Sequence, residues 1–548
     1  MSSIDKHTLN NEVNRRRTFA IISHPDAGKT TMTEKLLLLG GAIRLAGSVK
    51  AKKSKKFATS DWMELEKQRG ISVSTSVMNF EYRNVVCNLL DTPGHQDFSE
   101  DTYRTLAAAD AAIMLIDAAK GVEAQTIKLF EVCKLRGIPI FTFVNKLDRE
   151  SQDPLDLMHE IESVLNIATY PMNWPVSSGE RFKGIIERES KCLHFFEGRN
   201  TTTETVAKII PLSDKVQIEQ CVPADLLSGA LDGLEMVEMA GDAFSHEKFL
   251  KGQLSPVFFG AAMTNFGVRL FLEKFLDMSP PPSSKGSSEG KIDPFSTQFS
   301  GFIFKIQANM DPKHRDRIAF LRIVSGAYEV GLNVKVPRLN REIRLTHPQQ
   351  FFAQDRSTLE KAYAGDVVGI YDPGIFAIGD SLVENGDFVF EGIPAFAPEN
   401  FAVVRTTSAL KRKQLLKGLV QLCQEGTVQM FVDESRAASD PILAAVGVLQ
   451  FDVLLFRLKN EYNVECSLEN LSFKHARWTN ASIDDIARAK EQTDVVSVRD
   501  MQGCYLFLFK NDFSLSYFQE KCPYIRLFSS NSSLHGNMMD MATSVFEP

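Results

Sequence analysis

Short apolar runs alternate with longer mixed segments over the first part of the chain, and turn residues follow most of these runs. The intervals after the later runs suit right-handed crossover helices, so the pattern predicts an α/β domain with a mostly parallel sheet over 1–279. The rhythm fails at about 170–250, which we interpret as an insertion in that domain. The apolar runs are 18–22, 77–82, 85–90, 111–116, 138–144 and 257–259.

A different pattern begins after a segment rich in Pro, Gly and Ser at 280–290. Because this composition favours neither helices nor strands, we interpret 280–298 as a linker. Beyond it, short runs such as 301–306 and 318–324 alternate between apolar and polar positions, with turn residues between the runs. The region 299–394 is therefore predicted to form a small β-barrel domain.

The C-terminal region mixes both periods. Residues 410–425 and 448–462 have helical spacing, whereas residues 428–432 alternate between apolar and polar positions. This mixture favours an α+β domain, which we place at 395–530. The remaining residues, 531–548, give no such pattern and are predicted to form a flexible tail.

Composition restricts the class of protein. A chain of 548 residues with 44% hydrophobic content can bury several cores, enough for about three or four domains. No apolar run is long enough to cross a bilayer and residues 1–17 lack a secretory signal, so we expect no membrane contact and a cytoplasmic location. The eight cysteines form no Cys-x-x-Cys pair, which disfavours zinc and a disulfide framework. The net charge of −7 disfavours a surface that wraps DNA, although it permits a local RNA contact.

A phosphate-binding loop follows the first apolar run. In such a loop, backbone N–H groups and the next helix N-terminus converge on a polyphosphate. The Lys29 ammonium group would lie between the β- and γ-phosphates, and the Thr30 hydroxyl would ligate Mg²⁺. Ser23 stands where the usual pattern has glycine, and the loop by itself could be a turn that enters a helix. The expected nucleotide contacts here are Ser23, His24, Pro25, Asp26, Ala27, Gly28, Lys29, Thr30 and Thr31.

A second motif, Asp91-Thr92-Pro93-Gly94-His95, follows the apolar run 85–90. Asp91 is placed to hold the Mg²⁺ shell through water, and Gly94 lets the backbone approach the γ-phosphate without an intervening side chain. His95 could orient the attacking water, although a loop histidine is more often solvated. The catalytic candidates are therefore Lys29, Gly94 and His95, and the expected nucleotide contacts are Asp91, Thr92, Pro93, Gly94 and His95.

A third motif, Asn145-Lys146-Leu147-Asp148, closes the run 138–144 and determines the base. The Asp148 carboxylate can accept hydrogen bonds from N1–H and the 2-amino group of guanine, whereas adenine offers neither donor. Asn145 would add polar contacts, and the Lys146 stem would lie along the base. A backbone N–H of the loop Gly260, Ala261 and Ala262 can reach the guanine carbonyl.

Each motif alone could be an ordinary turn or the start of a helix without a binding function. All of them stand at the carboxyl ends of predicted parallel strands, however, which is the edge where open α/β sheets bind ligands. Between the first two motifs lies a candidate switch segment, 66–72, in which Ser72 is the candidate second hydroxyl ligand of Mg²⁺. Ser72 could ligate the metal only while a γ-phosphate orders the segment. The lysines within 50–56 form either a solvated loop or a contact to RNA phosphates.

Together these motifs resemble the elongation factor G-like translational GTPases, and among them the bacterial peptide chain release factor 3 family. The resemblance spans about residues 12–475 and fades beyond Trp478. Most members of the wider group carry Thr where this chain has Ser72, which weakens that assignment, since Ser lacks the stiffening β-branch. Further stretches that carry the resemblance are 60–64, 68–72, 97–105, 304–317 and 447–453.

The resemblance implies a GTP hydrolase that binds Mg²⁺ with GTP or GDP and is stimulated by the ribosome. It implies a monomer that promotes dissociation of the codon-reading, or class I, release factor after peptide release, with ribosomal RNA and proteins and class I factors as partners. No residue declares itself an arginine finger, so slow intrinsic turnover is expected. Two alternatives stay open: an elongation-type GTPase that moves tRNA and mRNA, and a GTP-gated binding protein whose hydrolysis is incidental.

Overall fold

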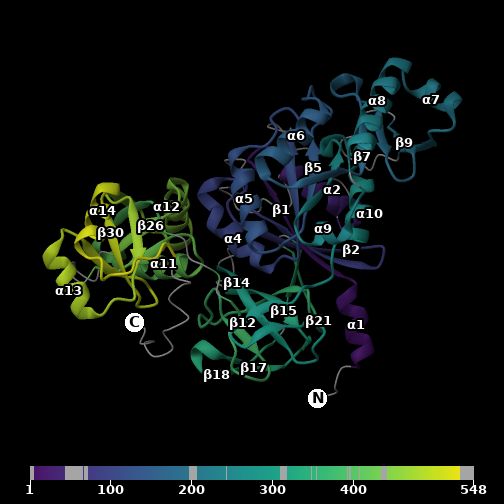
Figure 1. Cartoon of the computed structure of the whole chain (residues 1–548). Helices are drawn as coiled ribbons and strands as arrows, with labels where there is room; N and C mark the ends of the chain where they lie inside the picture. Colours follow the sequence, from purple (N-terminus) through teal and green to yellow (C-terminus); the bar gives the residue numbers. More distant parts are fainter. Residues whose placement is uncertain are drawn as a thin grey trace.

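The computed structural model consists of an α/β domain, a β domain beneath it and a C-terminal α+β domain at its side (Figure 1). Most of the candidate switch segment, the lysine run at 50–56 and the tail at 531–548 lie outside the described residues. The structure describes residues 5–42, 66, 72–196, 207–241, 243–308, 317–346, 349–352, 355–391, 393, 397–406, 408–433 and 441–530.

The sheet of the first domain runs in the order β2-β3-β1-β4-β5-β11-β6. Neighbouring strands are parallel except β2 and β3, which confirms the mostly parallel α/β sheet. The strands, all rich in apolar residues, are β1 (Arg16–Ser23), β2 (Ser76–Tyr82), β3 (Val85–Asp91), β4 (Ala111–Asp117), β5 (Ile140–Asn145), β6 (Ala168–Pro171) and β11 (Leu254–Phe259).

Helices cover both faces of this sheet, which explains why its central strands are apolar without alternation. One core cluster takes residues from α5 and α6, and a second takes residues from α2, α9 and α10. A helix that the sequence pattern did not predict, α1 (Lys6–Asn14), precedes the sheet and is capped by the Asp5 side chain. The other helices are α2 (Lys29–Leu39), α4 (Ser99–Ala108), α5 (Ala124–Leu135), α6 (Pro154–Leu165), α9 (His246–Leu250) and α10 (Val268–Met278), with the short 3₁₀ turns η1 (Gln96–Phe98) and η3 (Ala262–Thr264).

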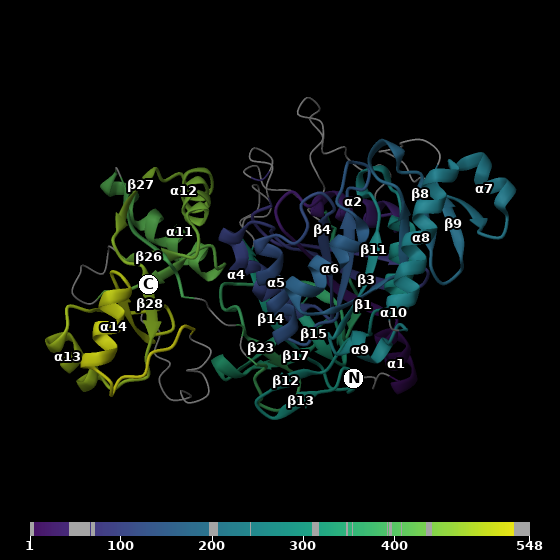
Figure 2. The same cartoon turned by 45° about the horizontal axis from the view of Figure 1, so that its top comes forward.

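A separate antiparallel sheet, β10-β9-β8-β7, interrupts the rhythm between β6 and β11. It projects from the first domain together with α7 and α8 (Figures 1 and 2). Lys274 of α10 contacts Glu187 of β8 at 3.0 Å and so ties this small sheet to the main domain. The elements are β7 (Asn173–Val176), η2 (Gly179–Arg181), β8 (Gly184–Glu187), β9 (Cys192–Phe195), β10 (Lys208–Pro211), α7 (Lys215–Cys221) and α8 (Ala224–Ala240).

The segment that the sequence suggested to be an irregular linker contains a hairpin, β12 (Lys285–Ser287) and β13 (Gly290–Ile292). Gly290 has φ +110°, a conformation that glycine adopts without steric cost in a tight turn. Ser283, just before the hairpin, donates through its backbone N–H and hydroxyl to Asp110 Oδ1 at 3.1 and 2.9 Å. Local turn chemistry and this distant anchor therefore order part of the segment.

The β domain packs one face of its strands inward and the other against the first domain. On β15, Leu321 and Ile323 lie in the core of the β domain, whereas Phe320 and Val324 join the core cluster of the first domain. This use of both faces explains why β14 and β15 are buried along their whole length. The elements are β14 (Ser300–Ala308), β15 (Arg317–Ser325), β16 (Ala327–Glu329), β17 (Asn333–Val336), η4 (Pro337–Leu339), β18 (Arg341–Arg344), β19 (Gln349–Phe352), β20 (Asp355–Thr358), β21 (Lys361–Tyr363), β22 (Val367–Tyr371) and β23 (Ser381–Val383).

A buried ion pair joins these two domains. Arg322 Nη2 lies 2.5 Å from Asp110 Oδ2, and each side chain is 1% exposed. Burial by itself would raise the pKa of Asp110, but Arg322 and Lys285 lower it below the ordinary value. Because removing one member of a buried pair leaves an uncompensated charge, this contact fixes how the β domain sits on the first domain.

The C-terminal domain confirms the α+β prediction and contains two sheets, β25-β26-β24-β27 and β28-β30-β29. Helices α11 and α12 cover the first sheet, and α13 and α14 cover the second. None of the described helices is long and apolar enough to cross a membrane. The elements are β24 (Asn400–Thr406), η5 (Ala409–Lys411), α11 (Arg412–Gln424), β25 (Gln429–Phe431), β26 (Ile442–Ala445), α12 (Val448–Tyr462), β27 (Cys466–Leu471), β28 (His475–Trp478), α13 (Ile483–Gln492), β29 (Val496–Arg499), β30 (Tyr505–Phe509) and α14 (Asp512–Lys521).

Candidate nucleotide site

The predicted site residues lie at one edge of the parallel sheet because β1, β3 and β5 all end there. The phosphate loop leaves β1 at Ser23 and enters α2 at Lys29. Asp26 and Gly28 have φ values of +67° and +105°, so the loop turns sharply before the helix. The first turn of α2 begins with the bond from Met32 N–H to the Gly28 carbonyl at 2.9 Å. The loop therefore has the backbone form that the motif predicts, with a helix N-terminus behind it.

A hydrogen-bonded network fixes the region that we call the guanine corner, which comprises Asn145 to Asp148 and Gly260 to Ala262. Asn145 Nδ2 donates to the Ala27 carbonyl, and the Ala262 N–H donates to Asn145 Oδ1, both at 2.9 Å. An added Cβ at Gly28 would lie 2.3 Å from Asn145 Nδ2, so this contact requires glycine. Asn145 thus joins the phosphate loop to the Gly260 loop.

Two further contacts complete the guanine corner. Lys146 Nζ donates to the Asp26 carbonyl at 2.5 Å and lies 2.7 Å from Asp117 Oδ2. The Leu147 N–H donates to the Gly260 carbonyl at 3.2 Å. Asp148 is half-buried and, among the described residues, makes no hydrogen bond through its carboxylate, so the carboxylate is available to accept from a base. Sequence reasoning missed Asp117, although its place at the end of β4 on the same edge was a usable signal.

A buried ion pair occupies the region that we call the phosphate corner, which comprises Lys29, Thr30, Ser72, Asp91, Gly94 and His95. The Lys29 ammonium group contacts Asp91 Oδ1 and lies 3.5 Å from Ser72 Oγ. The side chains of Lys29 and Asp91 are 7% and 1% exposed. The structure therefore brings together three residues that are far apart in the sequence and that were assigned to one phosphate and metal site.

The second oxygen of Asp91 tests whether this corner suits a cation. Asp91 Oδ2 is buried and has no hydrogen-bond partner within the described part of the chain. An unpaired buried carboxylate oxygen is costly, and a hydrated divalent cation would satisfy it. The Thr30 hydroxyl at the start of α2 supplies the hard oxygen that Mg²⁺ prefers. The side-chain chemistry at this corner thus fits Mg²⁺.

The second motif lies against the phosphate loop. Thr92 Oγ1 donates to the Ile21 carbonyl at 2.7 Å, and the Pro93 carbonyl accepts from Thr102 at 3.1 Å. A Cβ built on Gly94 would meet the Pro25 backbone at 3.6 Å, so the Gly94 backbone faces the loop directly. His24, in turn, places Nε2 3.3 Å from Glu123.

His95 caps the 3₁₀ turn η1, and its side chain is 31% exposed. Its Nδ1 accepts from the Asp97 N–H at 3.2 Å and lies 3.3 Å from Asp97 Oδ1. The ring contacts Asp97 and Phe98, residues of its own turn. In this structure His95 is therefore bound to η1 through Nδ1, and Nε2 is the ring nitrogen left for another partner.

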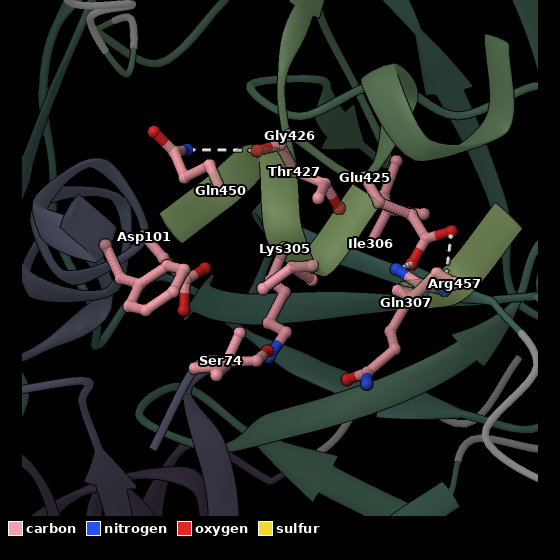
Figure 3. A pocket seen from close by; sticks show the side chains of 13 residues that line it. Ser74, Asp101, Lys305, Ile306, Gln307, Glu425, Gly426, Thr427, Gln450 and Arg457 are labelled. Atoms are coloured by element: carbon pink, nitrogen blue, oxygen red, sulfur yellow. Dashed lines mark hydrogen bonds and ion pairs between the residues drawn. The ribbon is translucent and has the colours of Figure 1, made fainter. Parts of the chain in front are cut away.

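All three domains meet next to this site, around a cleft that is partly open to solvent (Figure 3). Lys305 of β14 is buried and donates to Ser74 Oγ at 2.5 Å and to the Thr75 carbonyl. Burial lowers the pKa of Lys305 below its ordinary value, although Asp101 opposes this effect. The β domain is thus hydrogen-bonded to the residues that follow Ser72. Lys305, a lysine within an otherwise apolar run, was the sequence signal that could have revealed this contact.

Comparisons with known proteins agree with this arrangement. The family model "Elongation factor Tu GTP binding domain" matches residues 14–281, and "Elongation factor G domain 2" matches 298–385. A crystal structure of a protein from Thermus thermophilus has a TM-score of 0.67 at 23% identity, covering 85% of this chain and 71% of that one, which supports the shared fold. The fold and the domain order define a translational GTPase.

The remaining comparisons identify the family more closely. "Class II release factor RF3, C-terminal domain" matches residues 390–519. A protein from Symbiobacterium thermophilum named peptide chain release factor 3 is 53% identical, over 94% of this chain and 98% of its own length. A protein of the same name from Staphylococcus carnosus is 51% identical, over 95% of this chain and 99% of its own length. The chain belongs to the peptide chain release factor 3 family, which confirms the resemblance and assigns it to a GTPase of translation termination.

Proposed function

We propose that this protein uses GTP hydrolysis, stimulated by the ribosome, to promote dissociation of a class I release factor after the peptide has been freed. The match of residues 390–519 to the release factor 3 C-terminal domain carries the choice of termination over translocation. A GTP-bound form that prefers a ribosome arrangement incompatible with the class I factor would drive that factor off, and hydrolysis would then weaken its own binding. We propose that it acts as a monomer in the cytoplasm.

The guanine and phosphate corners support individual roles in this proposal. Asp148 accepts from the guanine edge, and the Gly260 loop offers backbone N–H groups to the guanine carbonyl. Lys29 leaves Asp91 and moves to the phosphates, because the same ammonium group cannot pair fully with both. Thr30 and Ser72 would hold Mg²⁺ directly and Asp91 through water. When bound, Mg²⁺ neutralises charge that develops on the phosphate oxygens.

His95 is the proposed positioning group for the attacking water, because its Nε2 is not engaged by η1 and Gly94 places it beside the phosphate loop. The protein contributes little covalent chemistry in this reaction, so orientation of the water and stabilisation of charge dominate. In this proposal the Lys29 ammonium group provides a cation at the phosphates, and Gly94 donates its backbone N–H to the γ-phosphate.

The decisive experiment measures the dissociation rate of a fluorescent class I release factor from post-release ribosomes, with this protein and GTP. Marked acceleration that requires GTP is the expected result. His95→Ala should reduce ribosome-stimulated GTP hydrolysis by about 10²-fold or more, the usual range for a positioned acid–base group. His159→Ala, on the exposed side of α6, is the matched control and should leave hydrolysis unchanged. Ribosome-stimulated hydrolysis without faster dissociation would contradict the termination role.

A further inference from the structure

One side chain connects the catalytic histidine to the C-terminal domain. Asp97 follows His95 in η1, and its side chain is 11% exposed. Its Oδ2 accepts from the Leu449 N–H at 2.8 Å, in the first turn of α12, and its Oδ1 lies 3.3 Å from His95 Nδ1. The Asp97 carboxylate thus lies beside the His95 ring and accepts from the N-terminus of a helix in another domain, where the helix dipole favours a negative charge.

The approach of these two segments depends on a glycine. A Cβ built on Gly447 would lie 2.1 Å from Asp97 Cγ and 2.5 Å from Asp97 Cα. Gly447 has φ −127°, a conformation that other residues adopt readily, so the requirement is for space alone. A side chain at this position would have to push α12 away from η1.

Apolar packing lies next to the Asp97 carboxylate. Phe98 of η1, Val73 and Val453 of α12 form a small buried cluster, against which Leu449 and Phe456 of α12 also pack. Val73 directly follows Ser72, so the cluster covers residues of both nucleotide-sensitive segments. Docking of α12 therefore fixes the loop that carries His95 through one hydrogen bond and one apolar contact.

We infer that Asp97 is a positioning residue that makes the orientation of His95 depend on docking of the C-terminal domain. The docked domain restrains His95 and keeps hydrolysis slow in the free protein. In this state the ring accepts at Nδ1 from the Asp97 N–H, which fixes the ring to its own turn. When α12 leaves, η1 loses the Leu449 partner and the cover of Val453, and the ring can turn toward the phosphates. This inference rests on the proposed role of His95.

Gly447→Ala tests the inference in the full-length protein without altering any side chain at the nucleotide. Its matched control is Gly229→Ala in α8, where an added Cβ meets nothing within 4 Å. We expect Gly447→Ala to raise kcat for ribosome-free GTP hydrolysis about ten- to a hundredfold with KM unchanged, the scale set by loss of a hydrogen bond to a charged group. Gly229→Ala should leave kcat unchanged. Amide exchange of the peptide 447–453 should become faster only in Gly447→Ala.

A second variant, Val453→Asp, covers the case in which Gly447→Ala does not separate α12 from η1. Val453→Asp places a charge in the apolar cluster and should raise kcat in the same way. In a His95→Ala background neither variant should raise the rate, because the restraint acts through that ring. If exchange of 447–453 accelerates while kcat stays at the control value in both variants, the inference is wrong. Normal hydrolysis by His95→Ala alone would instead overturn the proposed role of His95.

Discussion

The two corners of the nucleotide edge are built differently. In the guanine corner, Asn145 and Lys146 make four polar contacts that tie three loops together before any ligand binds. In the phosphate corner, Lys29 is paired with Asp91, and Asp91 Oδ2 has no hydrogen bond from the described residues. Asn145 and Lys146 are fully paired without a ligand. We expect the Lys29–Asp91 pair, in contrast, to open when phosphate binds.

From this difference we expect base selectivity to depend on the guanine corner and hydrolysis to depend on the phosphate corner. A preformed set of hydrogen bonds discriminates strongly between bases, since the wrong base leaves buried groups unpaired. A phosphate corner that must exchange an ion pair for phosphate and metal contacts responds to the presence of the γ-phosphate. The contact of Lys305 with Ser74 and Thr75 joins the residues that follow Ser72 to the β domain. We therefore propose that the first region provides recognition and that the second provides the switch.

The largest expected effect breaks the guanine corner alone. Asp148→Asn should lower affinity for GTP by about a thousandfold and shift preference toward xanthosine triphosphate, because the amide donates where the carboxylate accepted. Competition binding with both nucleotides measures the shift. Glu150→Gln, an exposed neighbour, is the control. Unchanged guanine selectivity in Asp148→Asn would refute the base assignment.

The next prediction isolates the phosphate corner. Withdrawal of Mg²⁺ should weaken GTP binding in the unaltered protein, because the metal neutralises charge on the phosphate oxygens. In Asp91→Asn the difference between binding with and without Mg²⁺ should largely disappear, whereas the preference for guanine over xanthine should persist. An undiminished Mg²⁺ effect in the variant would show that Asp91 does not hold the metal shell.

A third change asks how far the guanine corner is preformed. Asn145→Ala removes the bonds to the Ala27 carbonyl and from the Ala262 N–H and leaves both groups buried. We expect the free energy of unfolding of the nucleotide-free protein to fall by about 2 kcal/mol. Denaturant unfolding gives this value, with Gln152→Ala at an exposed site as the control. A loss no larger than the control would mean that nucleotide, and not the apo fold, orders this corner.

The smallest effect concerns Glu187 of β8, which contacts His194 of β9 and Lys274 of α10. His194, together with Ser190 and Lys274, lowers the pKa of Glu187 to about 2 against the opposing effect of burial. A carboxyl whose pKa is lowered by folding stabilises the fold above its unfolded value of 4.5, and this stabilisation is lost as the pH falls toward about 2. Glu187→Gln should therefore cost about 1–2 kcal/mol of unfolding free energy at pH 7.

This prediction is tested by measuring the unfolding free energy of the unaltered protein and of Glu187→Gln as a function of pH. The gap in unfolding free energy between the unaltered protein and Glu187→Gln should be constant near neutral pH and should narrow below pH 4.5, the unfolded value of the carboxyl pKa. Most of the narrowing should occur as the pH approaches the folded pKa of about 2. A gap that widens on acidification would contradict the sign of the pKa shift.

Much of the fold could be predicted because strand and helix periods are local. The run 85–90 lies within β3, and 448–462 coincides with α12. The α/β sheet and the α+β C-terminal domain are confirmed, while the roles of the individual site residues stay predictions. What failed depended on distant partners: α1 and the hairpin β12–β13 were missed, and the latter is anchored by Asp110, far away in the sequence.

The sequence alone determined the chemistry at the ends of β1, β3 and β5, because parallel strands bring their carboxyl ends to one edge whatever follows them. It also predicts the base, since the proposed choice of guanine over adenine rests on the charge at Asp148. Only the tertiary structure decided that Lys29 rests on Asp91 and that Asp97 joins His95 to α12. Such contacts between distant segments follow from packing within and between domains, which no local period encodes.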